Sequence, residues 1–264
     1  MTDSVLRQIG ATREDFLVHA TDGVLLRGWK VRPRDPNGDW VLLFHGVSDN
    51  RTGMLGQAQL LLRHGYSLVM MDSRHHGESG GSIATFGWLE RRDVQCIVNA
   101  LDAADNPRTL SALGSSMGAS IALQAAGIDQ RISGVVAESS FSDLREVTYD
   151  YAGFQWMPWL GKTIFRPATW TALSKAEKEG AFFAEDVSPE RAVATRPFAT
   201  LLICDERDHT IPCRHSQRIF EAASGPKELW KVPGADHASA LGAAPAEYER
   251  RVITFLTSLD AISR

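Results

Sequence analysis

The chain has 264 residues, of which 44% are apolar and 23% charged, and its formal net charge is −4. This length and apolar content fit one large α/β domain with a full core. The charge gives no electrostatic case for nucleic acid, since no basic run is interleaved with aromatic residues. No apolar stretch approaches the roughly 18 to 20 residues that span a bilayer, so we expect no membrane partner.

The N-terminal segment lacks the charged start and the apolar core of a signal peptide, which predicts a cytoplasmic protein. Cysteine occurs at Cys96, Cys204 and Cys213, an odd number without paired metal-ligand spacing. We therefore expect neither a disulfide framework nor a zinc site.

Apolar, strand-like runs alternate with helix-like segments along most of the chain. Runs at 15–20 and 24–30 flank a Thr-Asp-Gly turn and predict an opening hairpin. Six further strand-like runs follow, at 40–44, 67–72, 109–113, 132–137, 200–204 and 228–232. Helices are expected at 52–64, 89–104, 116–126, 213–223 and 246–259. Near-continuous apolar strands suit a parallel sheet with helices on both faces, so the sequence predicts an eight-stranded α/β sandwich.

One interval breaks this alternation between the sixth and seventh strands, because it contains no clear strand. Proline and glycine divide it into short pieces, and aromatic residues are frequent in it. An insertion of this length in a compact domain is usually a lid or a binding segment. We therefore expect a core formed by residues 1–143 and 197–264 and a small cap at 144–196.

The run Gly114-Ser115-Ser116-Met117-Gly118 carries the strongest functional signal in the sequence. It places Ser116 between two glycines, after a strand-like segment and before an alanine-rich, helix-like one. A sharp strand-to-helix turn of this kind holds a nucleophilic serine exposed above a sheet. The same turn directs the N–H of Met117 and the start of a helix dipole at a bound group. Because Gly-x-Ser-x-Gly alone also occurs by chance, the hypothesis depends on partners further along the chain.

Ser116 needs a base to remove its proton and a carboxylate to orient that base. The last two strands are followed by loops with suitable groups, at the sheet edge where Ser116 is expected. His237 lies a few residues past the last strand and is the expected base. The preceding loop offers Asp205, Glu206 and Asp208 as the acid, and Asp205 could instead cap its own turn.

The tetrahedral intermediate of such a reaction needs two N–H donors at its oxyanion. Met117 is expected to supply one, and Val47, in the loop after strand 40–44, the other. The loop at 72–79 contains aspartate, glutamate and two histidines, which are all potential metal ligands, so a metal site there is an alternative hypothesis. Adjacent histidines on a tight loop rarely reach one ion, so we expect no metal there and no cofactor.

Together these residues resemble the α/β-hydrolase superfamily over nearly the whole chain. The resemblance rests on His45-Gly46, Gly114-x-Ser116-x-Gly118, Asp208-x-x-Ile211-Pro212 and Gly234-Ala-Asp-His237. Segments 45–51, 72–79 and 86–90 are further similar to a bacterial group of small single-domain serine hydrolases, mostly assigned as esterases or peptidase-like hydrolases. The resemblance implies an eight-stranded, mostly parallel sheet with a cap after the sixth strand. It also favours Asp208 as the acid, although the Cys-Asp start of that loop departs from many relatives.

The resemblance implies a carboxylesterase-like serine hydrolase that cleaves small-molecule esters through an acyl-enzyme, as a monomer or homodimer. An aromatic cap predicts an apolar pocket for short to medium acyl chains. Phe154, Trp156 and Trp159 are its candidate substrate-binding residues, and core packing would explain them as well. The same triad serves amidases, peptidase-like enzymes, thioesterases, carbon–carbon hydrolases and acyltransferases. A non-catalytic binding protein that retains the fold is an alternative from a different class.

Overall fold

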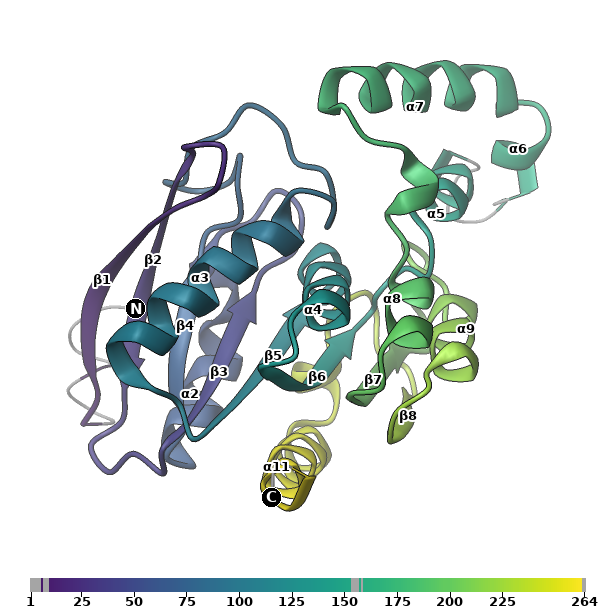
Figure 1. Cartoon of the computed structure of the whole chain (residues 1–264). Helices are drawn as coiled ribbons and strands as arrows, with labels where there is room; N and C mark the ends of the chain where they lie inside the picture. Colours follow the sequence, from purple (N-terminus) through teal and green to yellow (C-terminus); the bar gives the residue numbers. More distant parts are fainter. Residues whose placement is uncertain (1–5, 7–9, 153–156, 158, 263–264) are drawn as a thin grey trace.

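The structure is a computed structural model that describes residue 6 and residues 10–152, 157 and 159–262. Within this part of the chain, eight strands form one sheet in the order β1-β2-β4-β3-β5-β6-β7-β8 (Figure 1). The strands are β1 (Thr12–His19), β2 (Leu25–Arg32), β3 (Asp39–Phe44), β4 (Ser67–Met71), β5 (Thr109–Ser115), β6 (Ile132–Glu138), β7 (Ala199–Asp205) and β8 (Lys227–Val232). β2 pairs antiparallel with both β1 and β4, and all other neighbours are parallel. The predicted mostly parallel sheet is confirmed.

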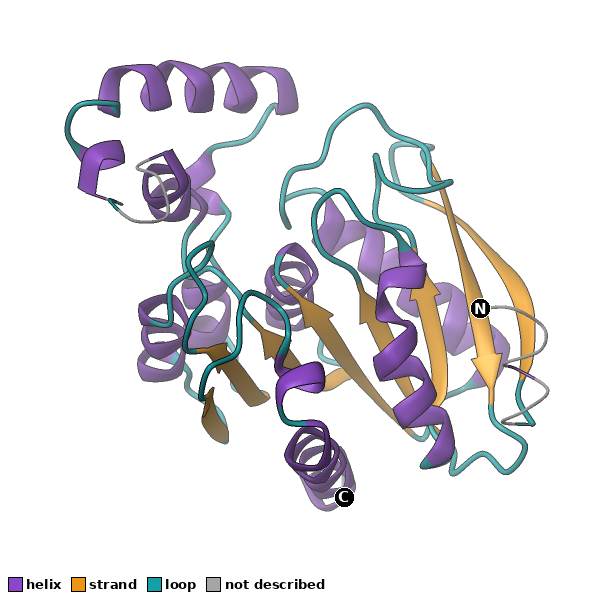
Figure 2. Cartoon of the chain, turned by 180° about the vertical axis from the view of Figure 1, so that it is seen from behind, coloured by secondary structure: helices purple, strands orange, loops and turns teal. Residues whose placement is uncertain are grey.

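The central strands are apolar along their length because both faces of the sheet are covered. In β3, Trp40, Leu42 and Phe44 pack on one side of the sheet, whereas Val41 and Leu43 pack on the other. The helices that supply the first layer are α3 (Glu90–Asp105), α4 (Met117–Ile128), α8 (Pro189–Thr195) and α9 (Arg214–Ala222). Those that supply the second are α2 (Leu55–Arg63), which follows η1 (Arg51–Met54), α10 (Ala240–Ala243) and α11 (Pro245–Ile262) (Figures 1 and 2).

Between β6 and β7 the described residues form helices and no strand, and the lack of strand-like runs predicts this absence of a strand. Before α8 the chain forms α5 (Leu144–Ala152), α6 (Trp159–Lys162), α7 (Arg166–Gly180) and η2 (Ala184–Asp186). α5, α6 and α7 stand beyond the sheet edge at which the parallel strands end (Figures 1 and 2). α8 instead contacts α4 and α9 of the core. The division into a core and a cap at 144–196 stays a prediction.

The aromatic residues of this segment are only partly described. Tyr151, Trp159 and Trp170 are 56 to 71% exposed, whereas Phe182 is buried in a small apolar cluster with Phe141 and other residues. Phe154 and Trp156 lie outside the described residues. An aromatic pocket over the site therefore stays a prediction.

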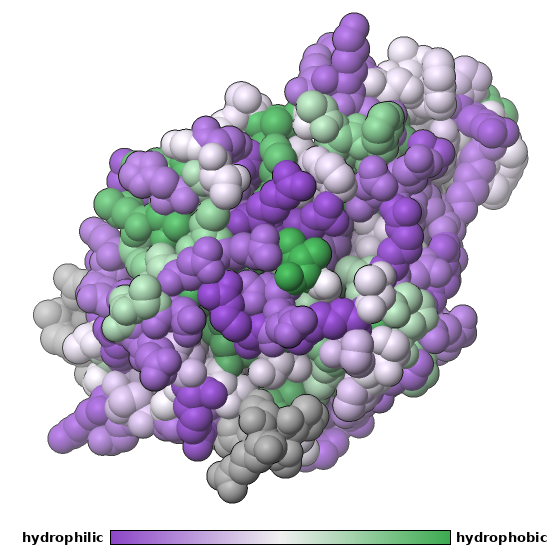
Figure 3. All heavy atoms as spheres, in the orientation of Figure 1, coloured by the Kyte–Doolittle hydropathy of each residue, from purple (hydrophilic) through white to green (hydrophobic). Residues whose placement is uncertain are grey.

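One face of the molecule is shown with all its atoms in Figure 3. Hydrophilic residues cover most of this face, and hydrophobic residues form small, separate patches. Of the helices in the described part of the chain, none combines the length and apolar content that crossing a membrane requires.

Candidate active site

Ser116 occupies the turn between the end of β5 and the start of α4. Its backbone has φ 55° and ψ −117°, which is unfavourable for a residue with a Cβ atom. A Cβ atom on Gly118 would lie 2.1 Å from the Phe44 carbonyl oxygen, and one on Gly114 would lie 2.3 Å from the Gly118 carbonyl oxygen. Both glycines of the sequence pattern are therefore required, because the strand, the turn and the helix contact one another through their backbone atoms.

Three side chains from separate loops form one hydrogen-bonded chain at this turn. The Ser116 hydroxyl oxygen lies 2.9 Å from Nε2 of His237. On the other side of the imidazole, Nδ1 lies 2.6 Å from Oδ2 of Asp208. Ser116 and Asp208 are buried, whereas the His237 side chain is 27% exposed. The structure thus brings together all three residues that the sequence analysis proposed as nucleophile, base and acid.

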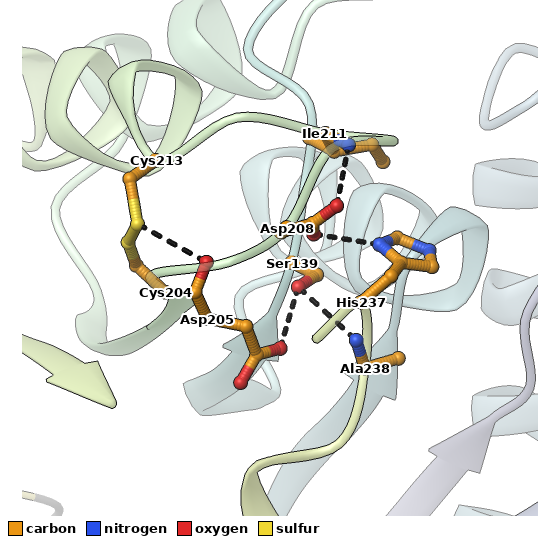
Figure 4. Close-up of a disulfide and its surroundings, with 8 residues drawn as sticks. All are labelled: Ser139, Cys204, Asp205, Asp208, Ile211, Cys213, His237 and Ala238. Carbon is orange, nitrogen blue, oxygen red and sulfur yellow. Dashed lines mark hydrogen bonds and ion pairs between the residues drawn. A yellow bond between two sulfur atoms is a disulfide. The ribbon is translucent and has the colours of Figure 1, made fainter. Parts of the chain in front are cut away.

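The loop after β7 orients Asp208 towards the histidine through its own backbone. Oδ1 of Asp208 accepts hydrogen bonds from the N–H groups of Thr210 (2.8 Å) and Ile211 (2.7 Å), which leaves Oδ2 for His237 (Figure 4). The competing Asp205 carboxylate accepts a 2.8 Å hydrogen bond from the Ser139 hydroxyl instead. Of the acidic residues in this loop, Asp208 is the one with a hydrogen bond to the imidazole.

The same loop is closed by a disulfide between Cys204 and Cys213, whose Cα atoms are 5.4 Å apart (Figure 4). The expectation of no disulfide was therefore wrong. An odd cysteine count indicates only that one thiol is left over, and here that thiol is Cys96. The pair meets because the chain leaves β7 at Cys204, turns at Asp208 and returns to begin α9 just after Cys213.

The loop after β3 passes close to the nucleophile, as predicted. A Cβ atom on Gly46 would lie 3.7 Å from the Ser116 Cβ atom, so the backbone at Gly46 borders the serine. The Val47 side chain is 52% exposed, whereas Met117 is buried at the start of α4. Buried His45 holds this loop in place, since Nδ1 donates to the Gly46 carbonyl oxygen and Nε2 accepts from the N–H of Ser73. Burial lowers the pKa of His45, which favours this neutral form.

The loop at 72–79 is organised around the carboxylate of Asp72. It forms a buried ion pair with Arg51, whose guanidinium also pairs with Glu78 and lies over the ring of Trp29. The backbone N–H groups of Arg51 and Glu78 donate to the same carboxylate at 2.7 Å each. No group of three or more potential metal ligands occurs among the described residues. Asp72 thus joins its own loop to Arg51, at the end of the loop that follows β3.

Two of the remaining histidines differ in their surroundings. His209, beside the acid, is exposed. His215 is fully buried, with Nδ1 2.9 Å from the Ser142 hydroxyl oxygen and Nε2 3.0 Å from Oδ2 of Asp150. This second Ser-His-Asp chain joins α9 to α5, and its burial leaves no access for a substrate.

The sequence analysis missed Glu138, the last residue of β6, and Ser139, which follows it. Both are buried, and the Glu138 carboxylate accepts a 2.8 Å hydrogen bond from the N–H of Ala240, which begins α10 directly after the histidine loop (residues 233–239). Burial, and next the negative charge of Asp205, raise the pKa of Glu138 to about 7. The available signal was an acidic residue at the end of an otherwise apolar strand.

Comparison with known proteins agrees with this geometry. The model described as "Alpha/beta hydrolase family" matches residues 41–251, which include all three hydrogen-bonded side chains. The chain belongs to the alpha/beta hydrolase family. The uncharacterized protein YqkD of Bacillus subtilis is 28% identical over 252 residues, which cover 93% of this chain and 79% of that protein.

Solved structures of two esterases share the fold. The Pyrococcus furiosus esterase Pf2001 aligns with a TM-score of 0.77 at 23% identity, over 98% of this chain and 95% of that one. Acetyl xylan esterase 1 from Thermoanaerobacterium aligns with a TM-score of 0.70 at 17% identity, over 94% and 84%. Family membership supports assignment of the protein as a hydrolase.

Proposed function

We propose that the protein is a serine hydrolase that cleaves carboxylic esters through an acyl-enzyme. The observation that carries this proposal is the unbroken chain from the Ser116 hydroxyl through His237 to Asp208, with contacts of 2.9 and 2.6 Å. A hydroxyl, an imidazole and a carboxylate in this order constitute an activated nucleophile.

In the acylation step His237 accepts the proton of Ser116 through Nε2 while Oγ attacks the ester carbonyl carbon. Asp208 holds Nδ1–H and stabilises the imidazolium that forms. Collapse of the tetrahedral intermediate breaks the bond to the alkoxide, which takes the proton from Nε2. In deacylation His237 removes a proton from water, hydroxide attacks the acyl-enzyme, and the proton returns to Ser116 Oγ.

The oxyanion is assigned to the backbone N–H groups of Met117 and Val47. Met117 follows the nucleophile and begins α4, so its N–H belongs to the positive end of that helix dipole. The proximity of Gly46 to Ser116 supports the N–H of the next residue, Val47, as the second donor. Preorganised donors of this type stabilise charge that develops only in the transition state.

We assign the substrates to small-molecule esters with short to medium, apolar acyl chains, with Trp159 of the cap among the binding residues. The names of the two solved neighbours, an esterase and an acetyl xylan esterase, support ester over amide chemistry. Amidase, peptidase-like, thioesterase, carbon–carbon hydrolase and acyltransferase reactions would use the same three residues.

The test is hydrolysis of p-nitrophenyl esters of graded acyl length by the wild type, Ser116→Ala and Ser115→Ala. We expect Ser116→Ala to lose turnover and its neighbour Ser115→Ala to retain it, with the wild-type optimum reporting pocket length. A fluorophosphonate probe should label the wild type and Ser115→Ala but not Ser116→Ala. Absence of labelling in the wild type would contradict the serine mechanism. Labelling without hydrolysis of any ester would exclude ester substrates and direct the search to amides and thioesters.

A further inference from the structure

Two consecutive residues at the end of β6 connect the three loops of the site. The backbone carbonyl of Glu138 accepts the N–H of Ser116 at 2.9 Å, and its side chain accepts the N–H of Ala240 at 2.8 Å. The adjacent Ser139 hydroxyl donates to Asp205 at 2.8 Å and accepts the N–H of Ala238 at 3.4 Å (Figure 4). The nucleophile turn at Ser116, the acid loop that runs from Asp205 to the start of α9, and the histidine loop are thus joined through these two residues.

The carboxyl of Glu138 also has an unusual electrostatic environment. Its Oε2 atom, Oδ1 of Asp205 and the hydroxyl of Tyr248 are buried without a hydrogen-bond partner among the described residues. The groups that face Glu138 are Asp205 from β7, Asp208 from the acid loop, His237 from the histidine loop and Tyr248 from α11. Two of them are carboxylates, so an additional negative charge on buried Glu138 is unfavourable.

We propose that Glu138 is a positioning residue of the hydrolase, which anchors the histidine loop and supplies a carboxyl whose charge acts on the imidazole of His237. This inference depends on the serine-hydrolase function proposed above. The anchor is the bond from Ala240 N–H to Oε1, only three residues beyond His237. The coupling follows from charge, because the negative Glu138 stabilises a positive imidazolium and the neutral form does not.

The direction of this coupling is determined by the charges. Protonated Glu138 is neutral and adds no charge near His237. When Glu138 loses its proton, its negative charge stabilises the imidazolium that forms during acylation. Burial raises the pKa of Glu138 to about 7, so this change of charge falls within the pH range of an activity profile. The acid limb of the wild-type profile of kcat/KM against pH therefore includes the ionisation of Glu138.

Two substitutions separate the anchor from the charge. Glu138→Gln keeps a carbonyl oxygen for the Ala240 N–H but cannot ionise, whereas Glu138→Ala removes both. We expect Glu138→Gln to keep plateau kcat/KM within about threefold and to move the acid limb of its pH profile to lower pH by about 0.5 to 1 unit. We expect Glu138→Ala to lower kcat by about tenfold or more with little change in KM, since a mobile histidine loop impairs the chemical step.

The matched control is Asp39→Asn, which removes a buried carboxylate at the start of β3, the opposite edge of the sheet. The acid limb of its profile of kcat/KM against pH should coincide with that of the wild type. If the acid limb of the Glu138→Gln profile also coincides with that of the wild type, the charge of Glu138 has no effect on His237 and this part of the proposal is overturned. A Glu138→Ala variant that folds and turns over as fast as Glu138→Gln would overturn the anchor. If Glu138→Ala does not fold, the Glu138→Gln profile decides alone.

Fluorophosphonate labelling separates this inference from the proposed function. Wild type that is not labelled at Ser116 contradicts the hydrolase itself. If the wild type is labelled and hydrolyses esters but its pH profile has the same acid limb as that of Glu138→Gln, only the proposed role of Glu138 is contradicted. Near-stoichiometric labelling of Glu138→Gln would also show that this variant is folded at the nucleophile turn.

Discussion

The hydroxyl of Ser139 donates a 2.8 Å hydrogen bond to Asp205, and so the carboxylate of Asp205 is directed to β6 and away from the imidazole. Asp208, three residues later, contacts His237 at 2.6 Å. Two acidic residues at the carboxyl end of β7 therefore have different tasks. Asp205, the last residue of β7, is bonded to Ser139, which follows β6, and Asp208 orients the histidine.

This difference predicts unequal effects of removing each charge. Asp208→Asn should lower kcat by about 10⁴-fold, because an amide presents the wrong group to Nδ1 of His237. Asp205→Asn keeps an acceptor for Ser139 and should lower kcat by no more than about tenfold. Steady-state kinetics on one p-nitrophenyl ester would test both, with circular dichroism to verify the fold. A nearly silent Asp208→Asn beside an inactive Asp205→Asn would show that the acid is misassigned.

The assignment of Val47 as an oxyanion donor predicts a backbone effect without a side-chain effect. Val47→Pro removes the N–H and should lower kcat by about 10² to 10³-fold. Val47→Ala retains the N–H, and because the valine side chain is 52% exposed its loss should change kcat little. The same ester assay checks both variants. Equal losses in the two would mean that the side chain matters and the amide does not.

The buried ion pair between Arg51 and Asp72 predicts a large effect on stability. Arg51→Met leaves the Asp72 carboxylate buried without its counter-charge, which should lower the free energy of unfolding by about 3 to 5 kcal/mol. The control is Glu78→Gln, since the Glu78 side chain is 69% exposed and should change stability by less than about 1 kcal/mol. Urea unfolding of the three proteins measures both differences. A small effect of Arg51→Met would show that the backbone N–H groups alone sustain Asp72.

The disulfide closes a loop whose ends are nine residues apart in sequence. Replacing Cys204 and Cys213 together by serine should lower the free energy of unfolding by about 2 to 3 kcal/mol, chiefly because the unfolded chain regains freedom. Dithiothreitol should lower the melting temperature of the wild type but not that of the double variant. Cys96→Ser, which removes the free thiol, should respond to dithiothreitol as the wild type does. A wild type insensitive to reduction would contradict the disulfide.

Sequence pattern sufficed for the fold because the strands are apolar on both faces and cannot be confused with surface segments. The run at 40–44, for example, is observed as β3 (Asp39–Phe44). The position of Ser116 also followed from local pattern, since the glycines at 114 and 118 reflect backbone contacts within a few residues. Strand order was not predicted, because periodicity does not determine which strands are neighbours.

The features that sequence pattern did not predict depend on contacts between distant segments. Glu138 reaches Ala240 across 102 residues, and no local signal indicates where the histidine loop will pass. The two disulfide cysteines are close in sequence, but their pairing depends on the turn that the acid loop takes after β7. Likewise, the choice between Asp205 and Asp208 rests on Ser139, a residue that the pattern did not mark.

The environment of Glu138 predicts how stability changes with pH. Its pKa is raised from 4.5 to about 7, chiefly by burial, so the folded protein retains a proton that the unfolded chain has released. The wild type should therefore lose stability as the pH rises from about 4.5 to about 7, by about 3 kcal/mol for this group. Glu138→Gln cannot ionise. The free energy of unfolding of this variant, relative to that of the wild type, should therefore be higher by this amount at about pH 8 than at about pH 4.5. Urea unfolding of both proteins at these two pH values isolates the effect, because every other titrating group is common to both. If the difference in stability between the two proteins does not change with pH, folding does not raise the pKa of Glu138.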